Sequence, residues 1–562
     1  MLTRSMVLVN EAWWVEPLPV HWVDKLVAEL EAKLQNRGKD EYIFNGGLSV
    51  SGLQHIGRLR GEVLLGEAVR RELEKRGFRV KQLLTLYTVD PWKGKDEQRR
   101  EFPDPKAAER YVGWPLDRVP DPKGCHASWV DHFWSDFGPY IGVFTDGKIE
   151  VVTTRELYKG RLKEFITTMV LPRRDEIRRV INKYRGRKPY QEGWIPLEPR
   201  CARCGRIDST EALEILGGER VRYRCSYCGY QGESSIEDSK LNWRIEWAGV
   251  WWSLGVDFEP YGKDHATPGG SRDSAAELAR LLGFEPPEGV WYEWVSLRAG
   301  GREADMSSSG FTGITPREWL DIAHPQILRF IYFLHPPTRR VVVDLSEIPS
   351  YYSQYYRAER IYFGIEEAST VEETRYLART YELSHPSNPP AKPPSQIPYS
   401  HAAIVAQVVG PERLWTDGLE RLKRAGLLGH DEYSIRWAKE LLEKAYKWAR
   451  RYAPKHLKFE IPDSPPEDAL RRIEKPDLLE KLAEVLESVE EWSEERIKQA
   501  LVEFGEGMSS SERRRFYRDF YLAIVGRPEG PRAAPLLSLM DRGFVVDRLR
   551  KAANLSRELK GR

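Results

Sequence analysis

Four of the five cysteines fall into two close pairs. Cys201 and Cys204 form one pair, Cys225 and Cys228 form the other, and 20 residues lie between the pairs. Cysteine pairs at this spacing can deliver four thiolates to a tetrahedral zinc ion, and two disulfides are the alternative. We expect zinc, because intracellular proteins rarely keep disulfides. Its expected role is structural, because a site closed by four thiolates leaves no open coordination position.

The fifth cysteine, Cys125, has no paired neighbour in the sequence. Free cysteine usually behaves as a small apolar side chain and is often buried. We therefore expect Cys125 to pack in a core and not to act as a nucleophile.

A second chemical signal lies in the stretch SVSGLQHIGRLRGEV, residues 49–63, where an apolar segment gives way to a predicted helix. A helix that begins beside a glycine-rich strand end presents unpaired amide groups and the positive end of its dipole, which favour phosphate. Gly57 would let a nucleotide approach the backbone, and His55 would donate a hydrogen bond to a phosphate oxygen. The alternative is that His55 satisfies a core hydrogen bond and Gly57 only lets helix and strand pack.

A third signal is the stretch ADMSSSGFTGITP, residues 304–316, which is rich in hydroxyl groups and glycine. Residues 306–309 of this stretch are named the serine loop below. By itself the stretch predicts a solvated turn. Its chemical interest depends on whether the fold brings it to the histidine stretch.

The histidine stretch must be positioned by the elements around it. Apolar residues at a spacing of four predict a helix over residues 20–36. EYIFNGG predicts a brief strand, the apolar spacing after His55 predicts a helix that stops at Gly77, and residues 78–90 predict a buried strand. This is a βαβ unit, which closes by a right-handed crossover into a parallel sheet.

The pattern changes after this unit. Residues 115–235 carry polar helices and the paired cysteines, which predicts an insertion within the nucleotide-binding fold. A proline-rich stretch at 385–398 cannot form a helix or a central strand and predicts a linker or a long surface loop. Beyond it, apolar residues with a 3.6-residue period over 435–452 and 478–489 predict packed helices.

The net charge of the chain excludes no class of binding partner. The chain has 87 basic and 85 acidic residues, so a polyanion must be held by a local patch. The run RRDEIRRVINKYRGRK, residues 173–188, is a candidate RNA-binding patch, and its alternative is a solvated helix face. The sequence shows neither a run of about 18 apolar residues nor a signal-peptide pattern, so we expect a cytoplasmic protein without a membrane partner.

Taken together, these stretches resemble the class I lysyl-tRNA synthetases of the archaeal type. HIG and MSSSG are similar to the two signature motifs of class I aminoacyl-tRNA synthetases. GWPLDRVPDPKG, LNWRIEWAGVWWSLGVDFEPYGKDHATPGGS and the paired cysteines extend the resemblance over roughly residues 20–345. The resemblance implies an α/β Rossmann-type catalytic domain with a zinc-binding insertion, followed by an all-α carboxy-terminal anticodon-binding domain.

The resemblance and the pattern along the chain predict five segments. In order, these are the N-terminal helix with the first half of the Rossmann domain, the zinc-binding insertion, the second half of the Rossmann domain, a connector with the serine loop, and the α-helical anticodon-binding region. Their expected bounds are 1–114, 115–235, 236–300, 301–350 and 351–562.

The implied activity is that of a lysine–tRNA ligase. Such an enzyme activates L-lysine with ATP to lysyl-adenylate and transfers the lysyl group to tRNA(Lys). The resemblance implies Mg²⁺ with the ATP and a structural Zn²⁺, and we expect a monomer. Two alternatives stay open: a paralogue that lost adenylation and acts as a tRNA-binding protein, and a class I synthetase for another amino acid.

The resemblance also implies roles for single residues. The expected catalytic residues are His55, Gly57, Arg58, Met306, Ser307, Ser308 and Ser309. The expected ATP contacts are His55, Gly57, Gly262, Asp264, Ser307 and Ser308. The expected lysine pocket contains Gly47, Ser49, Trp243 and His265. Because a desolvated ammonium needs a carboxylate partner, Glu246 and Asp90 are added as candidates for contacting the ε-ammonium of the substrate.

The serine loop departs from the family pattern. The family's second signature reads approximately Lys-Met-Ser-Ser-Ser-Lys-Gly, whereas this chain has Asp305 and Gly310 in place of the two lysines. We hypothesise that Arg58 or Arg302 brings the missing positive charge to the departing pyrophosphate. The alternative is that both arginines are surface residues and the loop uses hydroxyl and amide groups alone.

Overall fold

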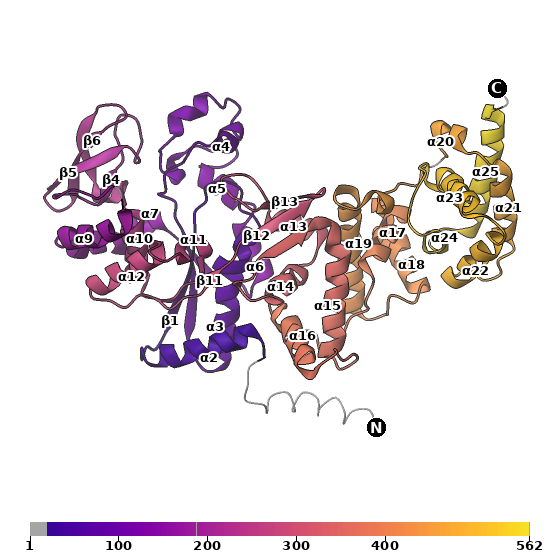
Figure 1. Ribbon diagram of the computed structural model, residues 1–562, viewed down its shortest axis with the longest axis horizontal. Helices are drawn as coiled ribbons and strands as arrows, with labels where there is room; N and C mark the ends of the chain where they lie inside the picture. The colour runs from indigo at the N-terminus through magenta and orange to yellow at the C-terminus, as the bar shows by residue number, and fades with distance from the viewer. Residues whose placement is uncertain (1–19, 187, 463, 561–562) are drawn as a thin grey trace.

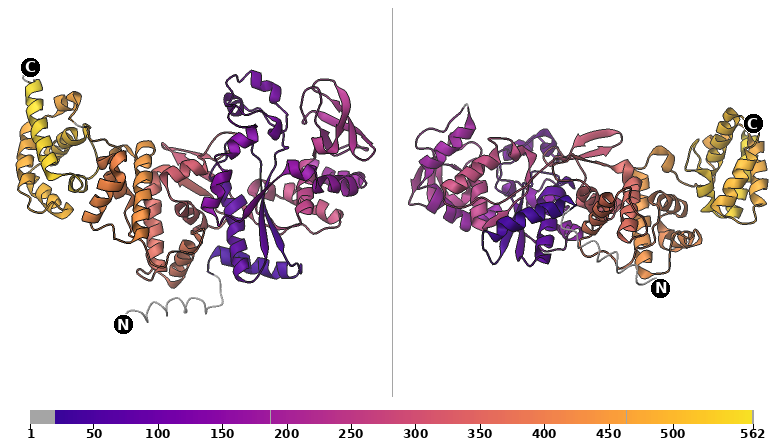
Figure 2. Two further views of the ribbon diagram at one scale, coloured as in Figure 1. Left: turned by 180° about the vertical axis from the view of Figure 1, so that it is seen from behind. Right: turned by 60° about the horizontal axis from the view of Figure 1, so that its bottom comes forward.

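A parallel sheet lies at the centre of the N-terminal half of the molecule (Figure 1). The computed structural model describes residues 20–186, 188–462 and 464–560. The first and last expected segments therefore extend beyond the described residues at both ends, and residue 187 of the basic run also lies outside them. The molecule is elongated, with the sheet at one end and the last helices at the other, and the views in Figure 2 agree.

The central sheet has four strands in the order β3-β2-β1-β9, and every neighbouring pair is parallel. The strands are β1 (Tyr42–Leu48), β2 (Val80–Leu86), β3 (Ile149–Thr153) and β9 (Val256–Phe258). β1, the helix after it and β2 form the expected βαβ unit. The predicted Rossmann-type α/β architecture is confirmed.

The crossover helix follows β1 at close range. It consists of a π-helical segment, η1 (Leu59–Leu65), and α3 (Gly66–Lys75), and the chain leaves it at Gly77 with a φ of 90°. A Cβ atom on Gly46 of β1 would lie 2.0 Å from the backbone oxygen of Glu62. Strand and helix can approach this closely only because residue 46 is glycine.

Helices cover both faces of the sheet and create two separate cores. One core contains α2 (Trp22–Gln35), which is the expected first helix, together with α3, and it continues into the connector. The second core is built by α8 (Arg161–Phe165), α9 (Arg174–Arg185), α10 (Trp243–Leu254) and α12 (Ser271–Leu281). In Figure 1, α12 and α3 lie to the left and to the right of β1.

The prediction of one continuous insertion over 115–235 is wrong, because a strand of the central sheet lies within this range. β3 pairs with β2 inside the central sheet, so one inserted segment lies between β2 and β3 and another between β3 and β9. The first contains α4 (Asp96–Arg100) and α5 (Trp129–Trp134), and the second contains the paired cysteines. β3 has only five residues at the edge of the sheet, and its Val151 is 44% exposed, so it lacks the apolar signal of a buried parallel strand.

A second, three-stranded sheet carries the serine loop. Its strands, in the order β13-β12-β14, are β12 (Val295–Ala299), β13 (Arg302–Asp305) and β14 (Val341–Asp344). β12 and β13 form an antiparallel hairpin, and the serine loop begins directly after β13. The connector therefore supplies this loop from a sheet of its own.

Helices are the only regular elements in the described residues after 344. They include α15 (Ile348–Tyr362), α16 (Val371–Leu383), α17 (Tyr399–Val409), α19 (Glu432–Arg451), α21 (Pro476–Glu487), α22 (Glu494–Phe504), α23 (Ser510–Val525) and α25 (Arg542–Lys560). α19 and α21 cover the two segments in which a 3.6-residue period predicted helices, which confirms that prediction. Residues 385–398 contain no helix or strand, as their proline content predicted. Among the described residues, no helix combines the length and apolarity needed to cross a membrane.

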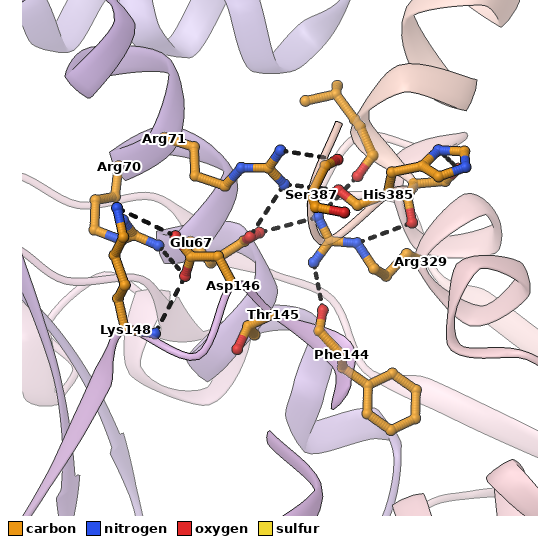
Figure 3. Close-up of polar contacts among 12 residues, drawn as sticks. Glu67, Arg70, Arg71, Phe144, Thr145, Asp146, Lys148, Arg329, His385 and Ser387 are labelled. Atoms are coloured by element: carbon orange, nitrogen blue, oxygen red, sulfur yellow. Dashed lines mark hydrogen bonds and ion pairs between the residues drawn. The ribbon is translucent and has the colours of Figure 1, made fainter. Parts of the chain in front are cut away.

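A buried ion network joins the two halves of the molecule (Figure 3). The guanidinium of Arg329, from α14 (Pro325–Phe333), lies 3.0 Å from the carboxylate of Glu67 on α3. The same guanidinium donates hydrogen bonds to the backbone oxygens of Phe144, Leu383 and Ser384. Because the last two lie at the end of α16, this network holds the helical half against the central-sheet half.

Candidate functional site

A cavity of about 420 Å³ opens at the carboxyl end of β1. Ligands of parallel α/β sheets bind outside the carboxyl ends of the strands. The histidine stretch and the serine loop both line this cavity, although they lie far apart in the sequence. All residues expected to contact ATP line it: His55, Gly57, Gly262, Asp264, Ser307 and Ser308. Arg58, Met306 and Ser309 line it as well.

His55 is buried and uncharged. Burial and, to a lesser extent, the charge of Arg58 lower the pKa of its imidazole to about 3. Its Nδ1 atom has no hydrogen-bond partner among the described residues. This nitrogen therefore does not make the core hydrogen bond that the alternative interpretation requires. A Cβ atom on Gly57 would lie 2.9 Å from Nδ1. Glycine at 57 therefore leaves open the space beside a nitrogen that a ligand can use.

The serine loop is held over the cavity by backbone hydrogen bonds and by packing. Backbone hydrogen bonds of 2.8 and 3.0 Å join Ser307 and Thr312 in both directions. A Cβ atom on Gly52 would lie 2.5 Å from a backbone oxygen of the loop, so the loop packs directly on the chain that leaves β1. Phe311, two residues after the loop, has its ring 5.3 Å from the ring of Phe133 on α5. The loop thus has a defined position even without a ligand.

The charge at the loop comes from its neighbours. Asp305, which stands where the family has a lysine, pairs with Arg340 at 2.8 Å. Arg58 reaches the loop, because its Nε donates to Ser308 Oγ at 3.3 Å. Arg302 lies at the opposite end of β13, is exposed and does not line the cavity. Of the two arginines in our hypothesis, the structure brings Arg58 to the loop and leaves Arg302 away from it.

The expected lysine pocket is assembled in part. Gly47, Trp243 and His265 line the cavity, and the ring of His265 lies 5.8 Å from that of Trp243. Ser49 and Glu246 do not line it. Ser49 follows the last residue of β1, so its backbone is close to Gly47 although it takes no part in the lining.

The structure contradicts the expected role of Glu246, because a cation of the protein already neutralises it. Lys240 Nζ lies 2.5 Å from its carboxylate, and the hydroxyl of Tyr158 donates to it at 2.5 Å. Asp90, the other candidate, pairs with the same lysine at 2.9 Å. Like Glu246, it does not line the cavity. One ammonium of the protein thus already pairs with both candidate carboxylates.

A different carboxylate, that of Glu259, lines the cavity. It is 2% exposed and accepts hydrogen bonds from the indoles of Trp247 and Trp251 at 2.9 and 2.8 Å and from Asn45 at 3.1 Å. All three donors are neutral, and among the described residues no cationic nitrogen lies within 4.0 Å of its oxygens. Burial raises the pKa of this carboxyl group. Glu259 is therefore a buried acid that lacks a close cation.

The space in front of Glu259 suits an ammonium group. A Cβ atom on Gly47 would lie 3.5 Å from Glu259 Oε1 and 3.6 Å from Tyr87 Oη. That hydroxyl is buried and has no partner among the described residues. The rings of Trp243 and Trp247 stack at 5.6 Å and both line the cavity. A carboxylate, an unpaired hydroxyl and aromatic faces together stabilise a desolvated cation.

The sequence contains a signal that could have identified Glu259. This residue directly follows β9, the neighbour of β1 in the sheet. Side chains that follow adjacent parallel strands meet at one edge, which places Glu259 beside Gly47. Without the strand order, however, Glu246 in the preceding helix is an equally acceptable acid.

The paired cysteines meet around one point, and none of them is in a disulfide. The sulfur–sulfur distance is 3.6 Å between Cys201 and Cys228 and 3.7 Å between Cys204 and Cys225. Four sulfurs placed about 2.3 Å from a tetrahedral zinc ion are about 3.8 Å apart. The four thiols therefore fit zinc in both number and spacing.

The expectation for Cys125 is wrong, because its side chain is exposed. Its sulfur lies 3.1 Å from His126 Nδ1 and 3.5 Å from His132 Nδ1, and Asp121 lies 3.0 Å from His132 Nδ1. The ligand atoms of these four residues lie within 4.8 Å of one another and form a second candidate metal cluster. The sequence signal for this cluster is the adjacent pair Cys125-His126, followed by His132 within eight residues. This signal is weaker than that of the first cluster, because it has no repeated cysteine pairs.

The basic run lies mostly on α9. Arg173 pairs with Glu176 at 3.0 Å, and Lys183 pairs with Glu277 of α12. These ion pairs reduce the free positive charge of the helix. The structure therefore favours a solvated helix face over a patch that is free to bind RNA.

Two family models match the chain. The one described as tRNA synthetases class I (K) matches residues 20–387, and the one described as anticodon binding domain matches residues 442–553. Three similar curated proteins are named lysine–tRNA ligase. Those of Methanocaldococcus jannaschii, Pyrococcus horikoshii and Thermococcus kodakarensis are 30%, 32% and 33% identical over 544, 548 and 548 residues. Each alignment covers 94% of this chain and 99% of the relative.

Proposed function

The chain belongs to the family of class I tRNA synthetases (K), and from this premise we propose that it is a lysine–tRNA ligase. One observation carries the proposal: His55, the serine loop and the buried carboxylate of Glu259 line a single cavity. Adenylate formation needs a nucleotide and an amino acid side by side in a fixed geometry. The cavity offers adjoining surfaces for both.

The proposed reaction begins when a carboxylate oxygen of lysine attacks the α-phosphorus of ATP. The bond between this phosphorus and the bridging oxygen breaks, and pyrophosphate leaves with the electron pair. The lysyl group then passes from the adenylate to a ribose hydroxyl at the end of tRNA(Lys), and AMP leaves. The protein forms no covalent bond, so positioning and charge stabilisation must supply the catalysis.

ATP, with Mg²⁺ on its phosphates, is assigned to the side of the cavity lined by the histidine stretch and the serine loop. Gly57 leaves space for the nucleotide, and neutral His55 offers a nitrogen without a partner. The hydroxyl groups of the loop are hydrogen-bond donors, and Arg58 adds positive charge beside Ser308. Gly262 and Asp264 are assigned to the ribose side.

Lysine is assigned to the side of the cavity lined by Gly47 and Glu259. Its ε-ammonium would pair with Glu259 and donate a hydrogen bond to Tyr87 Oη, beside the rings of Trp243 and Trp247. An amino acid with an acidic side chain would face a buried carboxylate, which is strongly unfavourable. This difference supports lysine over an acidic amino acid.

Zinc is proposed for both cysteine-containing clusters. Four thiolates suit structural zinc, and the mixed Asp121, Cys125, His126 and His132 set offers oxygen, sulfur and nitrogen ligands that zinc also accepts. His132 lies on α5, whose Phe133 supports the serine loop. A metal in the second cluster would therefore stiffen the wall behind this loop.

The helical region, residues 351–562, is proposed to read the anticodon. Residues 442–553 match the anticodon-binding model, and Figure 1 shows α21, α22, α23 and α25 at the end of the molecule opposite the central sheet. A partner that uses both the cavity and this region must be long. A tRNA has this shape, with its acceptor end and its anticodon at opposite ends.

Exchange of labelled pyrophosphate into ATP tests the proposal. The full chain is assayed with ATP and Mg²⁺, and with lysine, arginine, glutamate or glutamine in parallel. We expect exchange that depends on lysine. Exchange with a different amino acid alone would identify another synthetase, and absence of exchange with intact tRNA binding would favour the tRNA-binding paralogue.

A further inference from the structure

The cavity carries much negative charge for a site that receives a triphosphate. Burial lowers the pKa of both histidines that line it, His55 and His265, and so disfavours their charged form. Among the described residues that line it, Arg58 is the only lysine or arginine. The lining carboxylates are those of Glu62, Glu259, Asp264, Glu293 and Asp305. Further positive charge must come from the rim.

Lys95 is a rim cation that no carboxylate neutralises. Its Nζ donates to Ser309 Oγ at 2.9 Å, and Ser309 lines the cavity. Within the described parts of the chain, no carboxylate oxygen lies within 4.0 Å of this ammonium. Two other cations near the rim, Lys263 and Arg340, each already hold a lining carboxylate, at 2.5 and 2.8 Å. Lys95 is therefore available to an anion that enters the cavity.

The backbone anchors Lys95 to the cavity wall. Its N–H group donates to Gln98 Oε1 at 2.8 Å, Gln98 Nε2 donates to the backbone oxygen of Ser51 at 2.7 Å, and Ser51 lines the cavity. The preceding residue, Gly94, has a φ of 61°, and a Cβ atom there would lie 2.4 Å from Val112. This tight turn needs glycine. It places Lys95 beside the serine loop, although the two come from separate segments.

We propose that Lys95, together with Arg58, binds the terminal phosphates of ATP and stabilises the departing pyrophosphate. This inference rests on the proposed function. In the structure Lys95 donates to the neutral hydroxyl group of Ser309, whereas Arg58 donates both to the hydroxyl group of Ser308 and, at 3.2 Å, to the carboxylate of Glu62. A phosphate oxygen is a stronger acceptor for an ammonium than a neutral hydroxyl, so ATP would draw Lys95 to itself. A guanidinium has five N–H donors, so Arg58 can donate to a phosphate and keep its pair with Glu62.

The charge that Lys95 meets is defined by the reaction. The oxygen–phosphorus bond of the adenylate forms, the bond to the bridging oxygen breaks, and its electron pair stays on pyrophosphate. Negative charge therefore grows on the group nearest the serine loop. Lys95 and Arg58 would supply the positive charge that Asp305 and Gly310 do not.

Three variants of Lys95 and one control test the proposal by pyrophosphate exchange. Lys95→Ala should lower kcat about tenfold. This decrease is smaller than the 10²–10³-fold decrease typical of an enclosed donor, because Lys95 is exposed. It should raise the KM for pyrophosphate and leave the KM for lysine unchanged. Lys95→Arg should retain most activity. Lys106→Ala, an exposed lysine of the same segment that does not line the cavity, should match the wild type.

Lys95→Gln separates charge from a structural role. Glutamine can still donate to Ser309 but carries no charge, so it should behave like alanine. Wild-type kinetics in Lys95→Gln, or an unchanged KM for pyrophosphate in Lys95→Ala, would overturn the proposal.

The wild-type result distinguishes this inference from the proposed function. If wild-type protein shows no lysine-dependent exchange, the proposed function fails, and calorimetric binding of inorganic tripolyphosphate then decides the role of Lys95. If Lys95→Ala binds tripolyphosphate about fivefold more weakly than the wild type, the proposed role of Lys95 is supported. A decrease of this order is expected for the loss of one exposed charge pair. Equal affinity of the two proteins overturns the proposed role.

Discussion

Arg329 and Glu67 form an ion pair of 3.0 Å in which neither side chain has exposed surface. The pair connects α14 with α3, the helix that continues from the histidine stretch. Arg71 of α3 extends the network, since it pairs with Glu67 at 3.2 Å and donates to the backbone oxygen of His385 at 2.7 Å (Figure 3). Contacts made by α3 therefore help to orient the helical half relative to the cavity, together with the ion pair of 2.7 Å between Arg379 of α16 and Asp24 of α2.

Arg329→Met is expected to destabilise the protein by about 3–5 kcal/mol, the usual cost of breaking a buried ion pair from one side. The Glu67→Gln/Arg329→Met double variant should recover part of this loss, because it removes the buried carboxylate that the single variant leaves with Arg71 as its one cationic partner among the described residues. Thermal unfolding of both variants measures the difference. In Arg329→Met, tRNA charging should also fall more than pyrophosphate exchange, since only charging uses both halves. No recovery in the double variant would mean that the carbonyl contacts of Arg329 carry the stability instead.

Glu259→Gln should raise the KM for lysine about 30-fold or more, because removing one partner of a buried charge pair costs about 2 kcal/mol or more. The KM for ATP should change little. Burial raises the pKa of Glu259, so lysine should bind better as pH rises and the carboxylate ionises, and the glutamine variant should lose this dependence. The exposed Glu285→Gln is the matched control. An unchanged lysine KM would exclude Glu259 from the pocket.

Arg58→Ala should lower the rate of pyrophosphate exchange by about 10²-fold, the effect of removing one preorganised donor from a transition-state site. Arg302→Ala should stay within about twofold, because exposed side chains away from a site contribute little. Steady-state exchange kinetics of the two variants provide the comparison. Equal losses in both would contradict the position of Arg302 at the far end of β13.

The purified chain should contain two zinc ions, as measured by inductively coupled plasma mass spectrometry. His132→Ala should reduce the content to one and should also slow exchange, because α5 supports the serine loop through Phe133. Cys204→Ser should remove the other ion. A wild-type content of one that His132→Ala leaves unchanged would exclude metal from the second cluster.

Glu359 of α15 makes the stability of the helical half depend on pH. Burial raises the pKa of its carboxyl group to about 7, while Tyr381 and Gln396 donate hydrogen bonds to it at 2.9 and 2.7 Å. Because the folded pKa lies above the unfolded one, the stabilisation is complete below about pH 4.5 and is lost as pH rises through 7. The free energy of unfolding should fall by about 3 kcal/mol at most.

Glu359→Gln imitates the protonated acid and should remove this loss. The Tm of the variant relative to the wild type should therefore increase between pH 5 and pH 8, an interval that spans the folded pKa of about 7. The exposed Glu367→Gln serves as control and should show no such trend. A Tm difference that is constant with pH would show that Glu359 is ionised throughout.

Local patterns in the sequence were sufficient for features that depend on nearby residues. The βαβ unit followed from apolar spacing, and the helices α19 and α21 followed from a 3.6-residue period. The paired cysteines could be identified by residue type and spacing, whereas the histidine stretch and the serine loop gained their expected roles from the resemblance to a known family. Each of these features is defined within a few tens of residues, so the sequence contains the whole signal.

The partners of charged residues were decided by the tertiary structure alone. Glu246 and Glu259 lie in one short stretch of sequence, yet Lys240 neutralises the first while only neutral donors surround the second. The sequence likewise did not show that Arg340 holds Asp305 or that Lys95 reaches the serine loop. The free energy of a buried charge depends on the groups within a few ångströms of it, and folding brings those groups from distant positions.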